Sequence, residues 1–444
     1  MVGNLYAEML LGLVLRGLGA VSSFALMWMI ARIYGAGTIG LYQLGLTTIV
    51  LLATIAALGL PELVIRDLSH LISRGELANA RTSFLACCRY VFWRGIICAA
   101  LLALLAAPFS RYVLGEPAVA SFLVAFAPTA LFLGLLRLTT ALLRTTGRVV
   151  ASQSLEGVFY TSLAALCLAI AWRLGLADNN LLPVWFYQIG CGLAVLLSWL
   201  LVRRAISDWP KGRSLIRPND GVFIAAAPLT AHTGDWIHLL IVTSLLGLAE
   251  GGIYRTAFQF CMLFQLVNTS FNVMLGPHLA RAAGAGDRTE VNRIVRSAGL
   301  VGVGLCLPFA IAGWTTPTWL LGLFGPEFHE GALSLQILVT SQIISVARGP
   351  AGTALVMMHR ERYVLALEIV AVAAGVVAAL VLVGPLSIGG VACGPLVATL
   401  IRSVASSIKL REVLGATPQP MESPATKAEE VIGEPEAAPG ARSS

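Results

Sequence analysis

The sequence predicts an all-α integral membrane protein with about 12 transmembrane helices, and three observations lead to this fold class. Only 12% of the 444 residues are charged, about half of the roughly 25% that soluble domains carry. Hydrophobic residues make up 57% of the chain, which is more apolar surface than a soluble fold of this size can bury. These residues lie in continuous runs of about 20, the length of a helix that crosses a bilayer. The composition excludes a soluble enzyme, a nucleic-acid-binding protein and a disordered chain.

Each apolar run is expected to form one helix, because β-barrel strands would alternate apolar and polar residues over about ten positions. The first run is too long for the apolar region of a signal peptide, so we expect it to be retained as the first span. The expected spans are residues 9–31, 40–65, 90–108, 119–143, 150–172, 182–202, 222–246, 252–275, 297–320, 333–355, 363–384 and 388–410.

The basic residues predict the orientation of these spans. Of the 30 Lys and Arg residues, 22 lie in loops after even-numbered spans or in the C-terminal tail, and three lie in loops after odd-numbered spans. Cytoplasmic loops carry an excess of Lys and Arg, so both termini are expected in the cytoplasm. The net charge of +7 is therefore mostly a topology signal, and no nucleic-acid partner is expected.

The two halves of the chain share a weak internal repeat. The segment YGAGTIGLY at residues 34–42 corresponds to LGLAEGGIY at residues 246–254, and Arg137 and Gly115 have counterparts in Arg348 and Gly325. Each half contains six spans, so the repeats would be parallel, with a substrate cavity between halves that rock against each other. We therefore expect six-helix bundles over residues 1–210 and 211–411, followed by a disordered cytoplasmic tail over residues 412–444 that is rich in Pro, Glu, Ala and Ser.

The motifs of the two halves resemble those of a transporter family. Their order is R-x15-R-x-Y-G-A-G-x2-G-x-Y, LGLPELVIRDLS, a mid-helix acid at Asp235, LGLAEGGIY and LFGPEFHEGALSLQIL. This order is similar to that of the Wzx-type polysaccharide-unit flippases of the multidrug/oligosaccharidyl-lipid/polysaccharide (MOP) exporter superfamily. The resemblance implies a MATE-like fold that moves an undecaprenyl-diphosphate-linked oligosaccharide across the lipids of the bacterial inner (cytoplasmic) membrane, and it implies polysaccharide polymerase or ligase machinery as partners. Drug-exporting members share the architecture, so fold alone does not assign the substrate.

Five arginines lie inside the expected spans, where a charge is costly and points to function. A guanidinium stays ionised and makes bidentate hydrogen bonds to phosphate oxygens, so Arg16, Arg137 and Arg348 are expected to bind the lipid diphosphate. Arg255, near the outer end of its span, is expected to join this cationic lining. The alternative is that the long side chains extend to the lipid headgroups, which is the preferred interpretation for Arg402.

His232, Asp235 and His238 follow one another at three-residue spacing on the seventh span, within an arc of about 120°. Asp235 is expected to couple transport to a proton gradient, or to pair with Arg16 or Arg255 across the bundle. The three side chains have no fourth ligand nearby in the sequence, so no metal is expected.

Two acids recur at equivalent positions of the repeat, Glu156 on the fifth span and Glu368 on the eleventh. We expect them to pair with Arg137 and Arg348 of their own halves and to hold these guanidinium groups in place. The alternative is that both acids lie in water at the membrane interface.

Other sequence features narrow the activity. The eight cysteines are expected to be buried thiols, and Tyr42 and Tyr254 are expected in an aromatic belt at the membrane surface. No GxxxxGK[ST] loop is present, so ATP hydrolysis by this chain is not expected. We also expect no cofactor and no catalytic residue. A drug or cation antiporter of the same fold remains an alternative, and a membrane glycan polymerase or ligase is disfavoured because the outer loops are short.

Overall fold

The computed structural model describes residues 2–217, 219–358 and 360–415, and within these ranges the chain is helical without a β-strand. The main helices are joined by short π-helical turns (η1 to η3) and one 3-10 helix (η4). In chain order the elements are α1 (Val2–Ala57), α2 (Leu60–Leu63), η1 (Val64–Leu68), α3 (Ser69–Ser73), α4 (Leu77–Phe109), η2 (Ser110–Leu114), α5 (Ala118–Thr145), α6 (Val149–Gln153), η3 (Ser154–Phe159), α7 (Tyr160–Arg173), α8 (Leu182–Ala205), α9 (Val222–Leu245), α10 (Leu248–Phe260), α11 (Met262–Gly284), α12 (Arg288–Thr315), α13 (Pro317–Gly322), η4 (Pro326–Gly331), α14 (Ala332–Met357), α15 (Glu361–Leu386) and α16 (Ile388–Gly415).

Nine segments of the described chain are long and apolar enough to cross a membrane, which confirms the predicted all-α membrane class. These segments overlap ten of the twelve predicted spans, because the segment 14–57 covers most of the first two. The predicted spans 222–246 and 252–275 form α9 and the pair α10 and α11, which are not among the nine. Helix α10 has 13 residues and is too short to cross a membrane. Helices α9 and α11 carry polar side chains that line an internal cavity, which lowers their hydropathy.

The first two predicted spans form one long helix with a kink at Gly35. The φ of Gly35 is 81°, a backbone conformation that costs glycine little and other residues much. The equivalent residue of the second half, Gly247, has a φ of 132° and separates α9 from α10. The repeated glycines therefore mark the same sharp turn in both halves.

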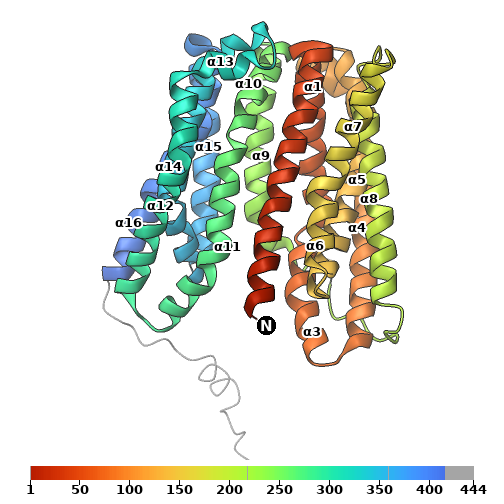
Figure 1. The fold of residues 1–444 in the computed structure, drawn as a ribbon, viewed down its shortest axis with the longest axis vertical. Helices are drawn as coiled ribbons and strands as arrows, with labels where there is room; N and C mark the ends of the chain where they lie inside the picture. Colours follow the sequence, from red (N-terminus) through yellow and green to blue (C-terminus); the bar gives the residue numbers. More distant parts are fainter. Residues whose placement is uncertain (1, 218, 359, 416–444) are drawn as a thin grey trace, which may run out of the picture.

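Figure 1 shows the helices gathered in two groups, with α4 to α8 on one side and α12 to α16 on the other, and with α1 between them. Helix α1 packs against α5 and α7 of the first group, and it also contacts α9, α10 and α11. We call the end of the molecule where α1 begins and α16 ends the lower end, and the opposite end, with α13, the upper end. The helix α16 continues to Gly415, so it includes the first residues assigned to the C-terminal tail, and residues 416–444 lie outside the described residues.

The apolar core is continuous at the upper end and divided at the lower end. One buried cluster at the upper end joins both groups through α1 and α10, and it includes Ile39 of α1, Phe126 of α5, Tyr254 of α10 and Phe324, which follows α13. At the lower end, one cluster centres on η1, α4 and α5, and a separate cluster centres on α11, α12 and α14. The two groups are thus held together by apolar packing at the upper end.

All eight cysteines are free thiols, five of them buried and three of intermediate exposure. This agrees with their expected role as small apolar side chains. Tyr42 and Tyr254, in contrast, do not form an aromatic belt at the surface, because both side chains are almost completely buried. Tyr42 packs edge-on against Phe126 and Tyr187. The aromatic-belt prediction was wrong because the upper end of the helices is a packed core at these positions.

Candidate functional site

A cavity of about 740 Å³ lies among α9, α11, α14, α15 and α16, and it brings together five of the residues singled out from the sequence, one of which is Arg402 of α16. His232 and Asp235 come from α9, Arg348 from α14 and Glu368 from α15. These helices are far apart in the sequence, and their packing collects the charged side chains around one space. We call this space the central cavity.

Much of the remaining lining of the central cavity is polar and uncharged, and the sequence reasoning did not identify it. The signal was present, because such residues recur at three- or four-residue spacing and therefore share one face of each helix. The set is Gln265 and Asn268 on α11, Ser341, Gln342 and Ser345 on α14, and Thr399, Ser403 and Ser406 on α16.

Glu368 pairs with Arg402 of α16. The distance from Arg402 Nη1 to Glu368 Oε1 is 2.7 Å, and Arg402 Nη2 donates a second, longer hydrogen bond to Thr399 at 3.4 Å. The expected pairing of Glu368 with Arg348 was wrong, because α16 packs between the two positions and supplies its own arginine. Arg402 was expected to extend to the headgroups, but its guanidinium group lines the central cavity.

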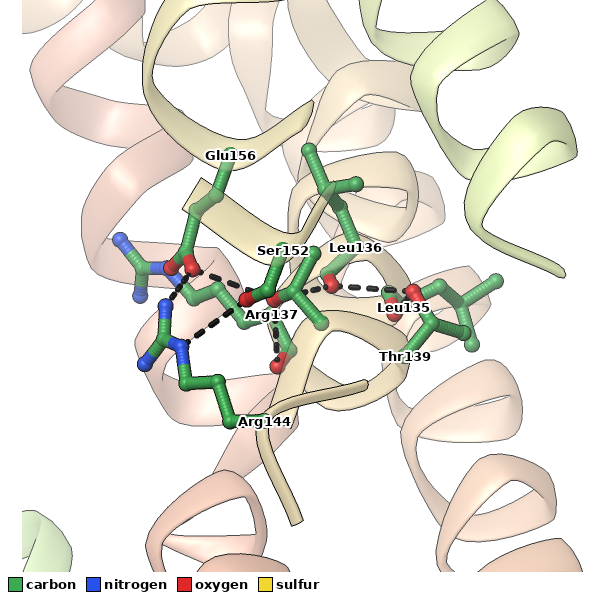
Figure 2. Close-up of polar contacts among 8 residues, drawn as sticks. Leu135, Leu136, Arg137, Thr139, Arg144, Ser152 and Glu156 are labelled. Carbon is green, nitrogen blue, oxygen red and sulfur yellow. Dashed lines mark hydrogen bonds and ion pairs between the residues drawn. The ribbon is translucent and has the colours of Figure 1, made fainter. Parts of the chain in front are cut away.

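Glu156 pairs with Arg144 of α5, and Figure 2 shows the two side chains in contact. Ser152 accepts a hydrogen bond from Arg144 Nε at 3.0 Å, and Thr140 donates one to Glu156 Oε2 at 3.1 Å. The expected partner, Arg137, lies two helical turns from Arg144 and does not pair with Glu156. The prediction was wrong because sequence spacing did not distinguish between the two arginines on α5.

Arg137 instead donates a hydrogen bond from Nη1 to Thr54 Oγ1 of α1, at 2.9 Å. It lines a cavity of about 210 Å³ together with Arg144, Glu156 and His232. His232 also lines the central cavity, so the two spaces adjoin at this side chain. The smaller cavity connects the charged residues of the first group of helices with those of the second.

Arg16 lies apart from the other arginines, in a third cavity of about 290 Å³ within the first group of helices. Its side chain is exposed, and among the described residues it has no hydrogen-bond or ion-pair partner. The same cavity is lined by Gln43 and by the aromatic side chains Tyr42, Tyr160 and Tyr187. The three arginines expected to form one cationic lining therefore lie in three different cavities, Arg16 in this one, Arg137 in the smaller cavity and Arg348 in the central cavity.

Arg255 connects α10 to α1 and does not line the central cavity. Its Nε donates a hydrogen bond to Gln43 Oε1 at 3.3 Å, and its guanidinium lies 4.7 Å from the centre of the Phe258 ring. Within the described part of the chain, Asp235 lies close enough to Arg255 for the two charges to attract each other, but it forms no direct ion pair with Arg16 or Arg255. Asp235 remains a carboxylate in the central cavity without an arginine partner among these residues.

His238 is buried and does not line the central cavity, in contrast to His232 and Asp235. Its ring packs directly against Gly394 of α16, where an added Cβ would lie 2.4 Å from His238 Nε2. The three-residue spacing thus places two of the three side chains in the cavity and the third in the packing between α9 and α16. Among the described residues, no group of three His, Cys, Asp or Glu side chains is placed to hold a metal ion.

The upper end is closed by contacts between the two groups of helices. Glu327 Oε1 of η4 accepts a hydrogen bond from the backbone N–H of Ala36, just after the kink in α1, at 2.8 Å. The carbonyl of Leu323 accepts hydrogen bonds from Trp28 Nε1 at 2.9 Å and from Arg32 Nε at 3.1 Å. The cavities are therefore separated from the upper surface by a layer of packed and hydrogen-bonded residues.

The repeated glycines Gly40 and Gly252 face each other in this layer. A Cβ on Gly40 would lie 1.9 Å from the carbonyl oxygen of Leu248, and a Cβ on Gly252 would lie 2.1 Å from that of Ala36. Helices α1 and α10 can approach this closely only because both positions lack a side chain. We call this crossing the glycine seam.

Comparison with solved structures shows which fold this arrangement forms. The chain is similar to a multidrug resistance MATE family transporter of the MOP superfamily in its inward-facing conformation, with a TM-score of 0.76, 12% identity and coverage of 91% of this chain and 98% of the other. The chain has the fold of the MATE and MOP-superfamily transporters. With the lipid II flippase MurJ in an inward closed conformation, the TM-score is 0.73 at 10% identity, with coverage of 90% and 87%.

The outward-facing conformation of a MATE family transporter gives a lower TM-score of 0.64, at 12% identity and with coverage of 92% and 95%. The higher TM-score with the inward-facing form agrees with the closed upper end of this structure. No family model matches the sequence, and no curated protein matches it. The similarity to known proteins is thus one of fold.

Proposed function

We propose that this protein is a transporter that flips an undecaprenyl-diphosphate-linked oligosaccharide from the inner to the outer leaflet of the bacterial cytoplasmic membrane. The fold of the MATE and MOP-superfamily transporters supports a transport function. The excess of basic residues in the loops of the lower end supports a cytoplasmic location for that end and for both termini. The flipped lipid would then reach polymerase or ligase machinery on the outer side.

The observation that carries the proposal is the pairing of the charges in the cavities. Glu156 pairs with Arg144 and Glu368 pairs with Arg402. Neither acid pairs with Arg137 or Arg348, the two arginines at equivalent positions of the internal repeat. Arg137 and Arg348 are thereby left without a carboxylate partner among the described residues, and each hydrogen-bonds only to a hydroxyl group, from Thr54 and Ser407 respectively. A guanidinium in this state retains most of its donors for phosphate oxygens.

The central cavity is suited to the rest of such a substrate. Its volume of about 740 Å³ falls within the roughly 300–1,000 Å³ typical of small-molecule sites. The amide and hydroxyl side chains that line it can donate to and accept from sugar hydroxyls. Transport requires that the upper-end contacts open while the lower ends of the two groups approach, as in other transporters built from repeats.

The test is glycan export in a deletion strain that carries the double variant Arg137→Glu/Arg348→Glu. We expect export to be lost and the lipid-linked oligosaccharide to accumulate on the cytoplasmic leaflet, because two carboxylates would repel the diphosphate. The matched control is Arg203→Gln/Arg204→Gln at the exposed lower end of α8, which should export like the wild type. Wild-type export by the double variant, at wild-type abundance in the membrane, would overturn the proposal.

A drug or cation antiporter is a second candidate, and Asp235 is the observation that favours it. This carboxylate lines the central cavity without an arginine partner among the described residues, so it could attract a cation or exchange a proton. The test is efflux of a cationic dye from cells or proteoliposomes under a proton gradient. Dye efflux that is lost in Asp235→Asn, together with normal glycan export by the same variant, would favour the antiporter over the flippase.

A further inference from the structure

A basic groove lies on the side of the molecule formed by α12, α14 and α16, near the lower end (Figure 1). Its volume is about 930 Å³, and within the part of the chain that the structure describes its lining includes four arginines and no carboxylate. The arginines are Arg288 and Arg296 of α12, Arg348 of α14 and Arg411 of α16. Arg296, Arg348 and Arg411 place positive charges around one space with no acid among the described lining residues, so the groove is suited to an anionic ligand.

The partners of these arginines leave the groove positively charged. Arg296 and Arg411 are exposed and have no hydrogen-bond or ion-pair partner among the described residues, and Arg348 has only a 3.4 Å hydrogen bond to Ser407. Arg288 donates from Nη1 to the carbonyl oxygen of Leu414 at 3.0 Å, so it is a partnered residue, and the other three arginines make the groove positively charged. Three carboxylates lie near these arginines in the sequence. Asp287 caps α12 by accepting a hydrogen bond from the backbone N–H of Glu290, while Glu290 pairs with Arg293 and Glu412 pairs with Lys409.

The surface beside the arginines is apolar and exposed. Leu300 lines the groove and is 67% exposed, and Val404 and Ile408 of α16 are 55% and 61% exposed. The last two line an adjoining hollow of about 460 Å³ that also contains Arg348 and Arg411. Exposed aliphatic side chains on a spanning helix face acyl chains. The groove therefore combines a basic floor for a headgroup with an apolar wall for a lipid tail.

We propose that this groove binds the phosphate headgroup of an anionic membrane phospholipid. Basic pockets between transmembrane helices are suited to such headgroups, and planar guanidinium groups bind phosphate oxygens in pairs. Arg348 lines both the groove and the central cavity, so a lipid bound in the groove engages a side chain that also serves the transport site. Binding of an anionic lipid thereby reduces the positive charge that Arg348 presents to the cavity. The inference stands independently of which substrate the cavity carries.

The test is lipid binding to the purified full-length protein, measured by native mass spectrometry with phosphatidylglycerol and phosphatidylcholine as matched probes. We expect phosphatidylglycerol to bind at least about tenfold more tightly than phosphatidylcholine. The double variant Arg296→Gln/Arg411→Gln should bind the two lipids equally. The control Arg203→Gln/Arg204→Gln removes two exposed arginines from another part of the lower end and should keep the wild-type preference.

Three outcomes would overturn the proposal. Equal binding of the two lipids by the wild type would show that the groove does not select an anionic headgroup. A full preference for phosphatidylglycerol in Arg296→Gln/Arg411→Gln would place the lipid site elsewhere. Farnesyl diphosphate that binds to the groove arginines, while phosphatidylglycerol does not displace it, would assign the groove to the transported lipid. The substitutions lie at exposed positions, and a thermal unfolding midpoint equal to that of the wild type would establish that the variants are folded.

Discussion

The glycine seam provides a quantitative test of how the upper end closes. In Gly252→Ala, the new Cβ would lie 2.1 Å from the carbonyl oxygen of Ala36, whereas ordinary contacts begin at about 3.4 Å. Helices α1 and α10 must therefore separate by about 1.3 Å at this point, or the crossing must shift. Overpacking of this kind typically costs about 1–3 kcal/mol. The cost applies to the closed upper end and disappears when the two groups of helices separate.

A bias of about 1–3 kcal/mol changes the ratio of the two conformations by roughly 5- to 150-fold. We expect Gly252→Ala to populate a form with a wider upper end. The assay is a distance distribution, from double electron–electron resonance in nanodiscs, between spin labels at Tyr112→Cys in η2 and Trp319→Cys in α13. Both positions are exposed at the upper end of opposite groups, and the native cysteines would be replaced.

The matched control is Gly37→Ala, on the same helix α1, because a Cβ at this glycine would have no atom within 4 Å. Its distance distribution should equal that of the parent protein. Gly40→Ala should resemble Gly252→Ala, and the double variant should add little, because both substitutions act on one crossing. An unchanged distance distribution in folded Gly252→Ala would refute the reasoning, since the seam would then tolerate a methyl group in the closed form.

Three further predictions concern single polar contacts. Glu368→Gln should lower the stability by about 1–2 kcal/mol, less than the loss of a fully buried pair, because Arg402 is 39% exposed. Thr54→Val should cost about 1–2 kcal/mol, because it removes the hydroxyl that accepts from Arg137. Both are measured as a lower thermal unfolding midpoint in detergent. Glu327→Ala removes the carboxylate that accepts a hydrogen bond from the backbone N–H of Ala36, just after the kink in α1. We expect this loss to favour the form with the wider upper end by about 1 kcal/mol, a roughly fivefold change in the populations seen in the distance measurement.

Each of these predictions has a control in the chain. Glu412→Gln removes an exposed pair with Lys409 and should leave the unfolding midpoint unchanged, so an equal loss in both acid variants would contradict the cavity pairing. Thr54→Ser keeps the hydroxyl, and a loss as large as that of Thr54→Val would assign the effect to packing. Glu327→Gln keeps an acceptor without the charge, and it should stay closer to the wild type than Glu327→Ala does.

The sequence was sufficient for the fold class, because a bilayer imposes a length and a hydropathy that can be read in one dimension. The predicted number of twelve spans stays a prediction, since nine segments of the described chain meet the length and hydropathy of a span. The sequence predicted the ends of the helices less well. Helix α4 begins at Leu77, whereas the apolar run that predicted it begins near residue 90, and α11 continues to Gly284. An apolar run marks only the part of a helix that needs lipid, and the ends outside the bilayer follow backbone propensity and capping.

For the charged residues, the sequence predicted several of the side chains that lie in the cavities but not which of them form ion pairs. The rule that an ionisable group in a span is costly selected Arg137, Arg348, Asp235 and Glu368, and the structure brings the last three to the central cavity. The same rule could not select partners, because a guanidinium can reach acids on several neighbouring helices. Which neighbour is nearest depends on helix rotation and crossing, which are set by packing.

The internal repeat is kept in the backbone of the two halves but not in their ion pairs. Gly40 and Gly252 form one seam, and Gly35 and Gly247 turn the chain at equivalent points, so the repeat preserves the architecture of the closed upper end. The acids do not keep equivalent partners. Glu156 pairs with Arg144 of α5, which lies before it in the chain, whereas Glu368 pairs with Arg402 of α16, which lies after it.

This difference makes the two halves chemically unequal. In the first half the pair lines a small cavity of about 210 Å³, and in the second it lines the central cavity of about 740 Å³. Even if the two halves move symmetrically during transport, the charged residues that line the cavities are therefore arranged differently in each half. Arg348, which has no carboxylate partner among the described residues, lies in the half with the larger space. Binding of an anion in that half and movement of the glycine seam are thus two separable properties, and variants of Arg348 should change the first without changing the second.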